Sequence, residues 1–151
     1  MKSVLDVAAY ILEKLGPMTA MKLQKLVYYS QAWSLVWDEK PLFREKVEAW
    51  ANGPVVRRLF DAHKGQFKVS DVTGGDAERL SGTEKETVDA VLKYYGRKSS
   101  QWLSDLTHLE APWRDARTGL PDGMRGSAEI SHAAMAQYYG SLDERPQTAE
   151  S

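Results

Sequence analysis

One segment of the sequence is apolar on nearly every side of the helix that its spacing predicts. From Thr19 or Ala20 to about Trp37, apolar and aromatic residues recur at helical intervals, and Gln24 and Gln31 form a narrow polar strip. A helix that is apolar nearly all round is usually a central, buried one. We therefore expect this helix to be the core of the fold.

Shorter amphipathic helices are expected around this central one. Apolar residues at intervals of three and four predict a first helix over residues 4–15, and similar patterns recur after residues 82, 99 and 131. Serine and threonine stand where helix caps are needed. The expected caps are Ser3, Thr83 (with Glu86 as a capping box), Ser99 or Ser100, and Ser131.

The stretch after the central helix carries turn signals and short extended pieces. Leu42-Phe43 and Val47–Trp50 are predicted to pair as a hairpin around residues 44–46, although an irregular extended segment would show the same pattern. Pro54 suits the first position of a helix, since proline lacks only a donor that has no partner there. We expect this third helix to be short and to end near Gly65.

Length and composition favour one globular domain. The 151 residues are 42% hydrophobic and 27% charged, without cysteine, which excludes disulfides and thiolate sites. The expected fold is mainly α: a compact single-domain helical bundle around a central buried helix, with a short β-hairpin or extended segment. The domain is expected over residues 1–139, followed by a polar, disordered tail over residues 140–151.

The sequence predicts a soluble, cytoplasmic protein. Asp6 stands where a signal peptide would continue with apolar residues. No stretch approaches the ~20 apolar residues of a membrane span. We therefore expect no contact with a membrane.

Residues suited to catalysis do not form a recognisable pattern. His63, His108 and His132 lack partners at metal-ligand spacing, and a metal site needs three or four convergent ligands. There is no G-x-S-x-G motif and no phosphate-binding loop. We expect a protein that is not an enzyme and that has no catalytic residues, no metal and no cofactor.

Positive charge gathers in the first half of the chain. Residues 1–70 carry 11 Lys and Arg against 7 Asp and Glu, whereas residues 71–151 carry 9 against 14. This asymmetry is either an accident of surface composition or a basic face that meets an acidic partner. Arg57, Arg58 and Lys64 are the best residues for nucleic acid, but Asp61 interrupts them, so nucleic-acid binding is a minor alternative.

Three parts of the chain together resemble a known family. The run Met21–Trp33, then Glu48-Ala49-Trp50 with Gly53-Pro54-Val55, and later Leu106-Thr107-His108 with Pro112-Trp113 are similar to the Panacea domain of SocA-like antitoxins and phage-associated GepA-like proteins. The similarity spans most of residues 4–139. Arg57-Arg58 departs from the pattern, which commonly has a proline and an acidic residue there.

The resemblance implies an antitoxin that neutralises a cognate toxin by direct protein binding. Members are usually encoded beside a toxin, and the domain pairs with toxins of many unrelated types. One alternative is an adaptor that delivers the toxin to a Clp-type protease, and another is a nucleic-acid-binding regulator of its own operon. Exposed aromatic and arginine groups usually dominate protein interfaces. The candidate partner-binding residues are Trp50, Asn52, Gly53, Arg57, Arg58, Lys64 and Tyr139.

Overall fold

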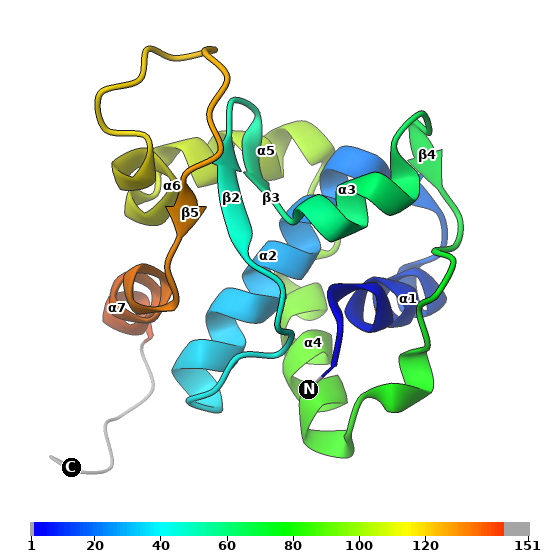
Figure 1. Ribbon diagram of the computed structural model, residues 1–151. Coiled ribbons are helices and arrows are strands. Elements are labelled where there is room, and N and C mark those ends of the chain that lie inside the picture. Colours follow the sequence, from blue (N-terminus) through cyan, green and yellow to red (C-terminus); the bar gives the residue numbers. More distant parts are fainter. Residues whose placement is uncertain (1, 144–151) are drawn as a thin grey trace, which may run out of the picture.

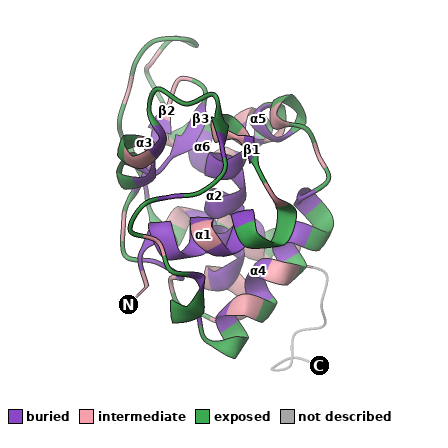
Figure 2. Cartoon of the chain, turned by 90° about the vertical axis from the view of Figure 1, so that its right-hand side faces the viewer, coloured by how far each residue is buried: buried purple, intermediate pink, exposed green. Residues whose placement is uncertain are grey.

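Helix α2 (Ala20–Trp37) runs through the middle of the molecule, and other helices surround it. The computed structural model describes residues 2–143, and in it α2 packs against helices on several sides (Figure 1). Figure 2 shows α2 in the colour of buried residues, behind α1. Every residue from Leu23 to Ser34 is buried. The predicted central helix and the predicted mainly α class are confirmed.

Within the described range, six further helices cover α2 or extend the layer beside it. Ser3, Ser99 and Ser131 cap their helices as predicted, and Ser3 forms a capping box with Asp6. The expected cap at Thr83 is wrong, because Ser81 and Glu84 form the capping box two residues earlier. The helices are α1 (Val4–Leu15), α3 (Arg57–His63), α4 (Gly82–Tyr95), α5 (Ser100–Leu109), α6 (Ala111–Ala116) and α7 (His132–Leu142), with a 3-10 turn at Ala77–Arg79.

Two small antiparallel sheets complete the fold of residues 2–143. Strand β1 (Met18–Thr19) pairs with β4 (Lys68–Val69) beside α1. In the second sheet, β2 (Val47–Trp50) lies between β3 (Gly53–Val55) and β5 (Glu129–Ile130). The β2–β3 hairpin stands at one end of α2, and the loop between α6 and β5 rises beside it (Figure 1).

The hairpin does not lie where the sequence predicted it. Leu42 and Phe43 are buried but form no strand, and the pairing is Glu48 with Val55 and Trp50 with Gly53. Gln31 explains the difference, since its amide binds the backbone N–H groups of Leu42 and Phe43 and the Phe43 carbonyl. A side chain thus takes the place of a partner strand for this extended segment.

Pro54 is likewise in a strand and does not begin a helix. Helix α3 starts at Arg57, with Val56 as its N-cap. Proline is tolerated in an edge strand, and β3 lies at the edge of its sheet.

Helix α7 reaches Leu142, so residues 140–142 of the expected tail are helical. Residues 144–151 of that expected tail lie outside the described residues. Within residues 2–143, no helix is long and apolar enough to cross a membrane.

Candidate functional site

The exposed turn of the β2–β3 hairpin forms a corner of the molecule, which we call the hairpin corner (residues 50–53). Ala51 and Asn52 connect the paired residues Trp50 and Gly53. Gly53 has φ +122, a conformation that side-chain-bearing residues rarely adopt. Asn52 is exposed, and Trp50 and Ala51 are partly exposed, so three side chains of the corner reach solvent.

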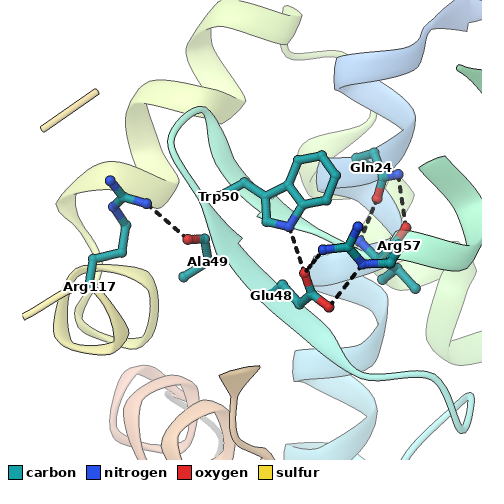
Figure 3. Close-up of polar contacts among 7 residues, drawn as sticks. Gln24, Glu48, Ala49, Trp50, Arg57 and Arg117 are labelled. Atoms are coloured by element: carbon teal, nitrogen blue, oxygen red, sulfur yellow. Dashed lines mark hydrogen bonds and ion pairs between the residues drawn. The ribbon is translucent and has the colours of Figure 1, made fainter. Parts of the chain in front are cut away.

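Helix α2 supports the hairpin from below through two buried polar side chains. The Gln24 amide accepts from Val56 N–H at 2.9 Å and donates to Val56 O at 3.3 Å and to His63 Nε2 at 3.0 Å. Lys25 is 1% exposed, and its Nζ donates to Pro54 O at 3.3 Å. The predicted polar strip of α2 is therefore buried, and Gln24 serves as the anchor of the β3–α3 junction (Figure 3).

Four consecutive backbone carbonyls of the hairpin are bound by side chains from α5, α6 and their flanks. Ser104 Oγ donates to Asn52 O at 3.1 Å, and His108 Nε2 lies 3.1 Å from Ala51 O. Trp113 Nε1 donates to Trp50 O at 2.7 Å. The buried Arg117 donates to Ala49 O at 3.0 Å and also binds the carbonyls of Pro121 and Met124. The backbone of the corner is therefore held in one position.

Glu48, Trp50 and Arg57 form a connected unit on the outer side of the hairpin (Figure 3). Glu48 accepts from Trp50 Nε1 at 2.8 Å and from two nitrogens of Arg57, the closer at 2.9 Å. The Arg57 guanidinium also lies 5.2 Å from the centre of the Trp50 ring. Partial burial alone would raise the pKa of Glu48, but these hydrogen bonds and the Arg57 charge bring it below its ordinary value.

A pocket of about 710 Å³ opens beside this unit. Its walls come from α2, the hairpin corner, α3 and the loop before β5. Among the described residues that line it, none is Asp or Glu. They are Ala20, Met21, Gln24, Lys25, Trp50, Ala51, Asn52, Val55, Arg57, Phe60, His63, Arg125, Gly126 and Ser127.

The pocket brings together some of the predicted partner-binding residues but not all of them. Trp50, Asn52 and Arg57 line it, and Gly53 lies directly above Lys25. Arg58 points elsewhere and pairs with Glu45 at 2.7 Å. Lys64 is exposed at the end of α3 and does not line the pocket.

Tyr139 corrects one expectation, because its side chain is fully buried. Its hydroxyl donates to Glu110 Oε1 at 2.7 Å and lies 3.0 Å from the Tyr28 hydroxyl, while Tyr29 donates to the same Glu110 oxygen. Burial raises the pKa of Glu110, although these two hydrogen bonds oppose the shift. A group in this position cannot contact a partner, since the core covers it on all sides.

Sequence reasoning missed Lys25, Phe60, His63 and the segment 125–127. Lys25 carries the one signal in the sequence, because a charge on a helix that is apolar on nearly every side must either reach solvent or serve a purpose. Burial, with a smaller effect of Lys25, lowers the pKa of His63, so its ring is neutral near pH 7 and accepts from Gln24. Within residues 2–143, no three His, Asp or Glu side chains are grouped to hold a metal ion.

Comparison with known proteins returns one family model and one curated relative. Residues 23–114 match the model described as "Antitoxin SocA-like, Panacea domain". The chain is also 30% identical over 112 residues to the Antitoxin SocA of Caulobacter vibrioides, an alignment that covers 64% of this chain and 58% of the relative. The chain thus spans less than two thirds of that relative. No solved structure matches the chain.

Proposed function

The chain belongs to the family of SocA-like antitoxins with a Panacea domain, and we propose that it neutralises a cognate toxin by binding it directly at the pocket beside the hairpin corner. In this proposal the protein acts in the cytoplasm and as a binding protein, with no catalytic step.

The observation that carries the proposal is the fixed presentation of Trp50 and Arg57 at the pocket. Tryptophan and arginine dominate the energetics of protein interfaces more than other residues do. Here Glu48 holds both side chains, and the backbone beneath them is bound at four successive carbonyls. Groups that are already ordered lose little conformational entropy when a partner binds.

Two alternatives use the same surface differently. A nucleic-acid-binding regulator is less well supported, because Arg57 and Arg58 are paired with Glu48 and Glu45. A protease adaptor would also bind the toxin, but it would shorten the lifetime of the toxin in cells. Toxin levels that stay constant when the antitoxin is present favour masking, and levels that fall favour delivery to a protease.

Two neighbouring arginines provide the test. We would express the chain with the toxin encoded beside its gene and compare Arg57→Ala with Arg58→Ala, each of which removes one charge and one surface ion pair. Such surface pairs contribute little to stability, so both variants should fold, which circular dichroism checks.

Arg57→Ala should weaken toxin binding at least about tenfold, a loss typical of an interface arginine, and should lower cell survival. Arg58→Ala should leave both within about threefold, because its side chain lies away from the pocket. Equal effects of the two substitutions, or none from either, would place the interface elsewhere.

A further inference from the structure

The charged side chains that line the pocket all carry positive charge. Lys25, Arg57 and Arg125 line it, and no carboxylate does so among the described residues. Glu48 binds two of the lining residues, Trp50 and Arg57, and neutralises the Arg57 charge, but it is not itself part of the lining. Arg125 forms no ion pair with any residue of the described range 2–143. A pocket of this kind attracts a negatively charged group.

Lys25 is the central feature of this surface. Its ammonium can donate three hydrogen bonds, but within residues 2–143 it donates one, to Pro54 O. No carboxylate of the described residues lies within 4.0 Å of Lys25 Nζ. Burial lowers the pKa of Lys25 to about 8. A buried charge without a counter-charge destabilises a protein, so its presence calls for a further role.

Aromatic rings form part of the pocket wall. Trp50 and Phe60 meet edge to face at a centroid distance of 5.0 Å, and Phe60 meets His63 in the same way at 5.5 Å. Met21 lines the pocket on the side of α2. Such a surface suits a flat ring or a short apolar side chain.

We propose that this pocket binds a carboxylate group carried on a flat apolar group, with the Lys25 ammonium and the Arg125 guanidinium as its counter-charges. We assign this carboxylate to the toxin, as an acidic side chain or C-terminus next to an aromatic residue. This assignment rests on the proposed function. A free organic acid carries the same chemistry, and the experiment separates the two sources.

Phenylacetate and phenylacetamide are suitable probes, since they have similar shapes and differ in charge. We would titrate each into the isotope-labelled protein and follow the indole N–H signal of Trp50 by NMR. Phenylacetate should bind at least about tenfold more tightly than phenylacetamide, because hydrogen bonds to charged groups are the stronger ones. Equal binding of the two probes overturns the proposal.

Lys25→Met tests the role of the ammonium, and Lys93→Met is its matched control, because Lys93 is exposed on α4 and away from the pocket. Lys25→Met should reduce phenylacetate binding to the level of phenylacetamide, whereas Lys93→Met should not change it. Unchanged binding by a folded Lys25→Met protein overturns the proposal. If Lys25→Met does not fold, Arg125→Gln on the exposed loop takes its place. The proposal then requires that Arg125→Gln weaken phenylacetate binding at least about threefold.

Two short peptides identify the source. Acetyl-Gly-Phe with a free C-terminus and acetyl-Phe-Asp-amide should both bind more tightly than phenylacetate if the toxin supplies the group. Weaker binding by both peptides overturns the assignment to the toxin. The two proposals can fail separately. If the protein binds phenylacetate through Lys25 but neither binds nor neutralises a toxin encoded beside its gene, the carboxylate site stands and the proposed function fails.

Discussion

Lys25 lies so close beneath Gly53 that a β-carbon on this glycine would come within 2.5 Å of Lys25 Cε. The backbone of Gly53 also has φ +122, which is strained for any other residue. Two independent constraints, one steric and one conformational, therefore require glycine where the hairpin corner meets the central helix.

Gly53→Ala should destabilise the domain by about 2–4 kcal/mol, since it adds a clash to backbone strain. In a Lys25→Ala background the clash is relieved, and the cost of Gly53→Ala should fall to about 1–2 kcal/mol. Urea unfolding of the four proteins of this cycle measures both values. The same cost in both backgrounds would show that the contact with Lys25 is unimportant.

The stability of the protein should rise with pH in the mildly alkaline range because of Lys25. Its pKa is about 8 in the folded state against an ordinary value of 10.5, so the unfolded chain binds more protons between these two values. Unfolding should therefore become less favourable as pH rises from 8 toward 10.5.

Relative to Lys25→Met, the wild type should gain about 2 kcal/mol between pH 7 and pH 9.5. Lys25→Met itself should be more stable than the wild type at pH 7, on the order of 1–3 kcal/mol. Urea midpoints at the two pH values test this, with Lys93→Met as the control that shows no such change. A difference between wild type and Lys25→Met that stays constant with pH contradicts the prediction.

Tyr139→Phe should act on stability and not on toxin binding. Removal of the hydroxyl takes away a 2.7 Å hydrogen bond to the buried Glu110, which should cost about 1–3 kcal/mol. The neighbouring Tyr138→Phe is the matched control and should cost less than about 0.5 kcal/mol, because Tyr138 is partly exposed. Thermal unfolding and toxin affinity per folded molecule are the measurements. If Tyr139→Phe weakened toxin affinity and left stability unchanged, Tyr139 would have to contact the toxin, against this prediction.

Trp33→Ala should leave a cavity in the core and cost roughly 3–5 kcal/mol. Trp33 is buried, stacks on Trp37 at 4.9 Å and donates from Nε1 to the Tyr95 hydroxyl at 3.0 Å. Urea unfolding gives the value. A cost below about 1 kcal/mol would mean that the centre of the fold is not packed around this side chain.

The sequence predicts the central helix and most helix caps because these depend on local periodicity and on single residues such as Ser3. The hairpin was misplaced because long-range contacts decide it: Gln31 holds Leu42 and Phe43 away from any strand. Pro54 fits the local pattern of a helix start, but it lies in an edge strand, where Lys25 binds its carbonyl. The local pattern therefore predicted the wrong element.

The candidate site was predicted in part for the same reason. Trp50, Asn52 and Arg57 lie within eight residues of one another in the sequence. A predicted turn followed by a helix therefore places them close together, as the pocket does. Arg125 comes from a turn-rich stretch without periodicity. Long-range contacts bring this stretch to the pocket: Ala49 N–H donates to Ala128 O, and Arg117 binds both Ala49 O and the carbonyls of Pro121 and Met124. Tyr139 was misjudged because aromatic residues in a short helix give no sign of which face is covered.

The walls of the pocket begin at Ala20 and end at Ser127. The pocket can therefore form only in a chain that contains all of these residues, and the N-terminal part of the pocket wall is present in the chain before the part formed by residues 125–127. Under the proposed function, neutralisation therefore requires residues 125–127, and chains that are truncated before residue 125 should give none.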